Sequence, residues 1–210
     1  ILESSADARG KLEVAAYPDG WPADPKALDG AATIVWYFDG LDKHPLRDAA
    51  RRAAFEAAMR RGAGLVALHQ SSTVPPNDDL GLPRWLGAAR YGMFDRTTQW
   101  AELVPATADR PLVRGIDAFA YRDEFYPTFR AAAKGGKLVP ILKSVLNPQY
   151  RDGHYLVEDR AEAANVAWAF ERDGGGRSFV YSGAHYLRTL DQPGARKMLL
   201  NAIFWTAGLD

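Results

Sequence analysis

Histidine side chains stand where two predicted strands end, and these side chains could carry chemistry. His69 is the last residue of the apolar run Gly64–His69, which is typical of a buried strand. In open α/β sheets ligands bind beyond the carboxyl ends of the strands, so His69 is expected at a ligand-binding edge. His185 follows a second predicted strand, Ser178–Ser182. Because imidazole titrates near neutral pH, His185 could act as an acid, a base or a metal ligand.

The segment Arg122–Tyr126 adds a carboxylate to this inventory. In an extended segment alternate side chains share a face, so Arg122, Glu124 and Tyr126 should point one way and Asp123 the other. An arginine, a carboxylate and a phenol on one face could bind polyol hydroxyls, or place a general base beside a hydrogen-bond donor. The alternative is an exposed Arg–Glu pair beside a half-buried tyrosine, which contributes little energy.

Each histidine also has a purely structural interpretation. His69 could hold a loop carbonyl, and His185 could cap a loop. His154, in a polar loop over residues 147–159, could cover the pocket like a lid or be solvated. His44 precedes a predicted helix and could cap it.

Two or three histidines with a carboxylate would suit zinc or another transition ion. No local motif such as HExxH is present. We therefore predict no cofactor and keep a divalent metal as an alternative.

The elements that would position these side chains follow from apolar periodicity. Residues 31–38 form an apolar and β-branched run that indicates a buried strand. Residues 45–61 place small apolar side chains on one face and charged side chains on the other at helical spacing, which predicts a helix. Pro45 suits the first turn of this helix, and Gly62 suits its end. With the strand 64–69 this makes a strand–helix–strand crossover between parallel strands.

The remaining chain predicts a mixed sheet, parallel in its core and antiparallel towards one side. Residues 173–176 (DGGG) predict a turn joining two antiparallel strands. The other predicted elements are the end of a helix at 2–9, strands at 11–16, 98–104, 119–126, 138–145, 165–171 and 178–182, and helices at 82–86 and 194–206.

Composition excludes several classes of function. The 210 residues include 26 Lys and Arg and 26 Asp and Glu, so the chain lacks the positive charge expected of a nucleic-acid binder. There is no cysteine, which excludes disulfides and a thiol nucleophile. No apolar stretch is long enough for a membrane span, and neither GxGxxG nor GxxxxGK[ST] occurs. The subcellular location stays open.

Several stretches, in this order, resemble the trehalose-utilisation (ThuA-like) family, a branch of the class I glutamine amidotransferase-like fold. They are ALDGAATIVWYFDG (27–40), HP (44–45), the segment 62–69, PLVRG (111–115), RDEFY (122–126), NVAWAFE (165–171), GRSFVYSGAH (176–185) and LNAIFWTAG (200–208). The resemblance implies one α/β domain over 1–210, a three-layer flavodoxin-like or amidotransferase-like fold with a mixed, mainly parallel sheet. It also implies a first strand, and we expect this chain to start after it.

The resemblance further implies where the site lies. In the amidotransferase parent the nucleophilic cysteine sits just after the strand equivalent to Gly64–Leu68, where this chain has His69 and no thiol, so glutamine hydrolysis by that route is excluded. His69, Glu124 and His185 are the implied catalytic residues. Asp123, Tyr126, Arg122, His154 and Gln70 are the candidate substrate-binding residues.

Two hypotheses about function follow. The first is an enzyme of carbohydrate metabolism that hydrolyses, eliminates or isomerises an oxidised (keto) sugar or glycoside, with Glu124 or His185 as base and His69 or Tyr126 donating to the oxyanion. The second is a non-catalytic carbohydrate-binding or assembly domain of a larger protein. In both, the partner is a small carbohydrate, and the chain could form a homodimer.

Overall fold

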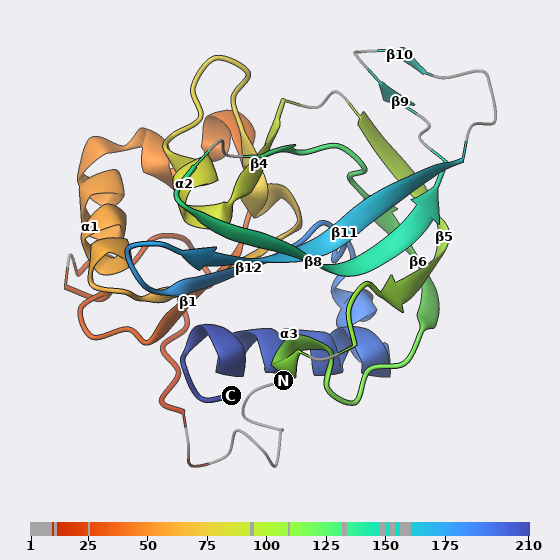
Figure 1. Cartoon of the computed structure of the whole chain (residues 1–210). Coiled ribbons are helices and arrows are strands. Elements are labelled where there is room, and N and C mark those ends of the chain that lie inside the picture. The colour runs from red at the N-terminus through yellow and green to blue at the C-terminus, as the bar shows by residue number, and fades with distance from the viewer. Residues whose placement is uncertain are drawn as a thin grey trace.

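A computed structural model of the chain describes residues 10, 12–24, 26–92, 95–108, 110–131, 134–147, 150–151, 154–155 and 161–210, with the backbone alone for 95, 150–151 and 154–155. Its centre is a curled sheet (Figure 1). The strands run in the order β1-β2-β12-β11-β8-β5-β9-β10, and β6 pairs with β5. They are β1 (Thr33–Tyr37), β2 (Gly64–Leu68), β5 (Asp95–Pro105), β6 (Phe119–Phe125), β8 (Gly136–Leu146), β9 (Tyr150–Arg151), β10 (His154–Tyr155), β11 (Glu162–Arg172) and β12 (Arg177–Tyr181).

The predicted strand–helix–strand crossover is confirmed. Strand β1 pairs in parallel with β2, and α1 (Ala49–Arg60) connects them. The α-helix begins later than Pro45, because the Asp48 side chain accepts a hydrogen bond from the Arg51 amide and caps the helix there. Pro45 instead opens the 3₁₀ turn η2 (Pro45–Arg47).

The sheet is mixed, as predicted, and its parallel part is compact. Strand β2 also pairs in parallel with β12, whereas β12–β11, β11–β8, β8–β5 and β5–β6 are antiparallel. The turn over residues 173–176 joins β11 and β12 as predicted. More of the strand pairing is antiparallel than we expected, because the long strands β8 and β11 pair over most of their length.

Helices cover the two faces of the sheet and complete three layers (Figure 1). On one face α3 (Pro193–Thr206) packs against a core that includes Val66, Phe179 and Ile203. On the other face α1 and the short α2 (Leu82–Leu86) cover a core that includes Leu65 and Trp168. This alternation of neighbouring residues between two cores explains why β2 is apolar throughout.

Several local predictions are wrong. Strand β1 is not buried but lies at the sheet edge, where Val35 and Tyr37 are 42% and 43% exposed. Residues 12–16 form no strand, and the predicted helix end at 2–9 lies outside the described residues. The polar loop 147–159 contains the paired strands β9 and β10.

A second, small sheet that the sequence did not predict flanks α2. It consists of β3 (Thr73–Val74), β4 (Ala88–Tyr91) and β7 (Arg130–Ala131). The remaining 3₁₀ turns are η1 (Leu41–Lys43), η3 (His69–Ser72), η4 (Pro111–Val113) and η5 (Leu187–Asp191). Over the described residues, none of the helices is both long and apolar enough to cross a bilayer.

Candidate functional site

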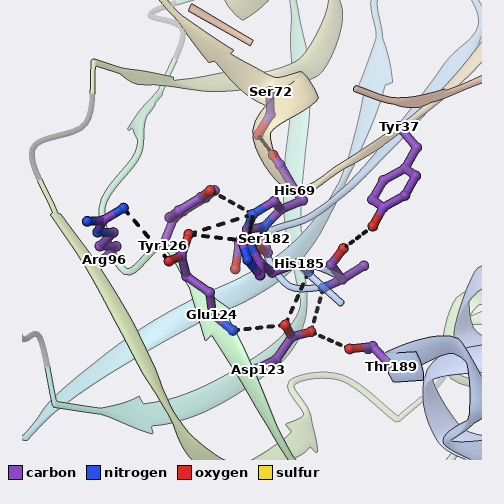
Figure 2. A network of polar contacts seen from close by, with 11 residues as sticks. Tyr37, His69, Ser72, Arg96, Asp123, Glu124, Tyr126, Ser182, His185 and Thr189 are labelled. Carbon is purple, nitrogen blue, oxygen red and sulfur yellow. Dashed lines mark hydrogen bonds and ion pairs between the residues drawn. The ribbon is translucent and has the colours of Figure 1, made fainter. Parts of the chain in front are cut away.

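His69, Glu124 and His185 converge at one point beside the sheet (Figure 2). His69 Nε2 lies 3.0 Å from His185 Nδ1. Glu124 Oε1 lies 3.7 Å from His69 Nε2 and 3.8 Å from His185 Nδ1. The three side chains come from the ends of β2 and β6 and from the loop after β12, so the topology brings together residues far apart in the sequence.

His69 occupies a sharp turn where β2 ends. Its φ of 53° lies in the left-handed region, which is unusual for a residue with a Cβ. The turn is held by Ser71 and Ser72, whose hydroxyls donate to the carbonyl oxygens of Leu68 and His69. The imidazole is thereby directed back across the sheet edge towards β6 and His185.

One tautomer of His69 fits its contacts. The carbonyl oxygen of Ser182 lies 3.0 Å from Nδ1 and can only accept, so Nδ1 carries the hydrogen and Nε2 the lone pair. Burial lowers the pKa of His69 to about 4, although the hydrogen bond to Ser182 acts in the opposite direction. The imidazole is therefore neutral near pH 7, with an acceptor atom aimed at Glu124 and His185.

Tyr126 borders the same point. Its hydroxyl lies 2.8 Å from His69 Nε2, and its ring stacks on the imidazole with centroids 4.7 Å apart. The guanidinium of the buried Arg90 lies over the Tyr126 ring, 3.6 Å from its centroid. Burial raises the pKa of Tyr126, with Arg90 opposing and Glu124 adding to the shift, so the phenol keeps its proton.

Asp123 is fully buried and faces away from this point. Its carboxylate accepts hydrogen bonds from the amides of Glu124, Ala184 and His185 and from the hydroxyl of Thr189, as Figure 2 shows. The structure thus places Asp123, a predicted substrate-binding residue, under the loop that carries His185. Tyr37 holds the same loop from the other side by donating to the Ala184 carbonyl.

A cavity of about 230 Å³ opens beside His69 and His185. Gln70, a predicted substrate-binding residue, lines it together with Tyr37, Phe38 and Asp39. The sequence did not single out the last three, although they lie at the carboxyl end of β1 and the carboxyl ends of parallel strands meet at one edge. A larger hollow of about 580 Å³ is lined by Arg52, Glu56 and Arg84 among others and by none of the predicted site residues.

Arg122 is a second predicted residue, after Asp123, that is not brought to this point. Arg122 is exposed on β6 opposite Trp100, and no hydrogen bond or ion pair found among the described residues joins it to His69 or Glu124. The backbone of His154 lies in β10, and its side chain is outside the described part. Arg96, on β5, was not predicted, and its guanidinium lies 4.0 Å from Glu124 Oε2.

Comparison with known families decides the relationship. The sequence profile of the trehalose-utilisation family, ThuA, matches residues 4–206. The chain belongs to the ThuA family. This membership confirms the resemblance and makes the protein a relative of carbohydrate-related proteins. No protein among those with curated descriptions matches the chain significantly.

Solved structures share the fold, and two of the three named here are described as ThuA-like. A ThuA-like protein from Bacteroides uniformis is 15% identical, with a TM-score of 0.65 over 87% of this chain and 71% of that one. The cytoplasmic protein STM3548 from Salmonella typhimurium is 11% identical, with a TM-score of 0.60 over 90% and 76%. A ThuA-like protein from Parabacteroides merdae is 15% identical, with a TM-score of 0.58 over 84% and 70%. At these identities the likeness shows the three-layer α/β fold of the ThuA-family chain, and the chemistry of its site has to be argued from the residues themselves.

Proposed function

We propose that this ThuA-family protein is an enzyme that acts on a keto sugar or keto glycoside by acid–base chemistry. The observation that carries the proposal is the convergence of His69, Glu124 and His185 beside a cavity, with their ligand atoms within 4.8 Å of one another. Charged and titratable groups buried together at the mouth of a cavity are the usual mark of a reaction centre.

The contacts of each side chain divide the roles. His69 presents a lone pair at Nε2, so it accepts a hydrogen bond and does not donate to an oxyanion, unlike one of the roles expected from the sequence. Tyr126 keeps its proton and is the donor. Glu124 is the general base, because its carboxylate is buried beside these groups and removal of a carbon-bound proton needs an acceptor.

The reaction begins at the carbon beside the keto group. Glu124 takes the proton from that carbon, and the bonding electrons move to the carbonyl oxygen to give an enolate. Tyr126 donates a hydrogen bond to this oxygen. Return of the proton to the opposite face of the same carbon gives the epimer. In elimination the carbonyl re-forms, a carbon–carbon double bond forms, and the leaving group on the next carbon departs with its bonding electrons.

The size of the cavity limits the substrate. Its volume of about 230 Å³ lies below the roughly 300–1,000 Å³ of pockets that enclose drug-sized ligands. We therefore expect it to receive one sugar ring, with the rest of a glycoside outside. Gln70 and Asp39 offer hydrogen-bond partners for its hydroxyls.

The test is exchange of carbon-bound hydrogen. A 3-keto glucoside is incubated with the protein in D₂O, and loss of the hydrogens beside the keto group is followed by NMR. Glu124→Gln should slow the protein-dependent exchange by about 10²–10⁴-fold. Glu102→Gln is the matched control, since Glu102 is exposed on β5, and it should exchange at the wild-type rate.

The alternative is a carbohydrate-binding domain without catalysis. Few side chains line the cavity, which is consistent with binding alone. Gln70 and Asp39 could bind sugar hydroxyls, and the rings of Tyr37 and Phe38 could pack against the sugar. Saturable binding of the keto glucoside with no exchange above the protein-free rate would support this alternative and overturn the enzyme. Equal exchange by the wild type and Glu124→Gln would reject Glu124 as the base.

A further inference from the structure

Three metal-ligand atoms face one another at the centre of the site. They are Nε2 of His69, Oε1 of Glu124 and Nδ1 of His185, with separations of 3.0, 3.7 and 3.8 Å. A tetrahedral ion with bonds of about 2.0–2.1 Å keeps its ligand atoms about 3.3 Å apart. The observed separations bracket that value, so one ion can contact all three atoms with small movements.

Hydrogen bonds alone leave this arrangement incompletely satisfied. His69 Nε2 is an acceptor, because Nδ1 donates to the Ser182 carbonyl, and the Tyr126 hydroxyl can serve it. Glu124 Oε1 is buried, and it finds no hydrogen-bond partner in the part of the chain that the structure describes. The Glu124 side chain is only 9% exposed, so this oxygen is costly to bury without a positive partner. A cation between the three atoms supplies that partner.

The groups behind the three atoms have the form of an outer coordination shell. Histidines that bind metals usually donate their second ring N–H to a carbonyl or carboxylate, as His69 does to Ser182. The backbone of His185 is fixed because Asp123 accepts its amide and that of Ala184. These contacts orient both imidazoles before an ion arrives.

We propose that His69, Glu124 and His185 form a three-ligand site for a divalent transition-metal ion of the zinc class. Two imidazole nitrogens and one carboxylate suit zinc and its neighbours, whereas magnesium and calcium prefer oxygen ligands throughout. The His185 side chain is 39% exposed and lines the cavity, which leaves a further coordination position open towards it. Three protein ligands and one open position are the pattern of catalytic zinc.

The inference deepens the proposed function and rests on it only for what the ion would do to a sugar. A bound ion would be held by His69, Glu124 Oε1 and His185 and would act as a Lewis acid towards the keto oxygen, while the second oxygen of Glu124 would remain for proton transfer. Binding of the ion is independent of any substrate and is measured without one.

The experiment uses the whole chain, stripped with a chelator and dialysed. Zn²⁺ is titrated by calorimetry, and Co²⁺ replaces it to report coordination through its visible absorption. The wild type should bind one ion per chain, with the intense cobalt bands of a tetrahedral site. His185→Ala and Glu124→Gln should weaken binding by at least about 100-fold. Glu102→Gln, exposed on β5, should bind like the wild type. Circular dichroism checks that each variant is folded.

The outcomes separate the two proposals. If the wild type binds one ion per chain and both ligand variants lose this binding, the site is supported. If the protein also converts no keto sugar under any condition, the proposed function alone is overturned. Equal weak binding by all four proteins overturns the site. Exchange of the keto glucoside that continues at the same rate in the chelated protein, with no ion bound, leaves the proposed function standing and overturns any part of the ion in that reaction.

Discussion

Two residues in the left-handed region flank the candidate site. His69 and Ala184 have φ values of 53° and 69°, and neither is glycine. Such conformations cost on the order of 1–3 kcal/mol each and persist where the surroundings determine them. At His69 the Ser72 hydroxyl holds the backbone by donating to its carbonyl oxygen. At Ala184 the amide donates to Asp123, and the carbonyl oxygen accepts from the Tyr37 hydroxyl. The strain therefore lies at the two positions that aim the imidazoles at each other.

His44 gives a prediction about pH that is separate from the site. It is 2% exposed, packs edge-on against Trp36 and Phe38, and accepts the Leu46 amide at Nδ1. Burial lowers its pKa to about 4 from 6.5, with a contact to the Ser71 backbone acting in the opposite direction. The unfolded chain takes up the proton near pH 6.5 and the folded chain only near pH 4. The free energy of unfolding therefore falls as the pH drops from 6.5 to 4.

Urea unfolding at pH 7 and pH 4.5, in the presence of a chelator, measures this effect. His44→Gln keeps an acceptor for the Leu46 amide but cannot be protonated. The variant should lose less stability than the wild type on acidification, by on the order of 2 kcal/mol. The same loss in both proteins would show that His44 does not stay neutral in the folded chain.

At the scale of residues the sequence predicted the centre of the site better than its walls. His69, Glu124 and His185 were recognisable because imidazoles and a carboxylate at strand ends are chemically distinctive. Tyr37 and Phe38 line the cavity but look like ordinary apolar residues at the end of a strand. Asp123 was placed on the opposite face from Glu124, as alternation predicts, but its partner, the loop 184–189, could not be inferred from local pattern.

At the scale of elements Asp123 joins strand β6 to the loop after β12. Its carboxylate accepts three amides and the Thr189 hydroxyl, at distances of 2.7–3.1 Å. Asp123→Asn turns one acceptor oxygen into a donor that faces other donors. Because hydrogen bonds to a charged group contribute about 1.5–3 kcal/mol each, we expect the free energy of unfolding to fall by about 3 kcal/mol.

The same variant should loosen the loop that carries His185. Hydrogen–deuterium exchange of the amides of residues 184–189 should become faster than in the wild type, while the amides of β2 keep their protection. Asp173→Asn, in the exposed turn between β11 and β12, is the control and should change stability by less than about 0.5 kcal/mol. Unchanged exchange at 184–189 in Asp123→Asn would contradict the idea that this carboxylate holds the loop.

Elements with a clear apolar or periodic pattern were predictable, including the five-residue helix α2 at residues 82–86, whereas the two-residue strands were missed. The helix α3 and the pairing of β11 with β12 followed from periodicity and from one turn motif. The two-residue strands β3 and β7 carry no periodicity at all, and their pairing partner β4 decides their conformation. Residues 12–16 alternate like a strand but have no strand partner among the described residues, and extended backbone without a ladder is not a strand.

At the scale of the whole molecule the fold depends on how closely α3 approaches the parallel strands. The helix ends at Thr206, whose hydroxyl lies 2.8 Å from that of Thr33 on β1. Gly64, the first residue of β2, leaves the space for this approach. A Cβ on Gly64 would overlap the Thr206 carbonyl oxygen and lie 2.6 Å from its carbon. The spacing of two layers therefore depends on one missing methyl group, which no periodicity in the sequence reveals.

Gly64→Ala tests this dependence. The obstructing atoms belong to backbone at the end of a packed helix, which cannot turn aside like a flexible side chain, so the variant should lose about 3 kcal/mol of unfolding free energy. Gly174→Ala is the matched control, because its Cβ would meet open space and its φ is compatible with alanine. It should be as stable as the wild type or slightly more stable. If Gly64→Ala unfolds at the same urea concentration as Gly174→Ala, α3 can shift away from β2 without loss, and the contact between Gly64 and Thr206 does not set the spacing of the layers.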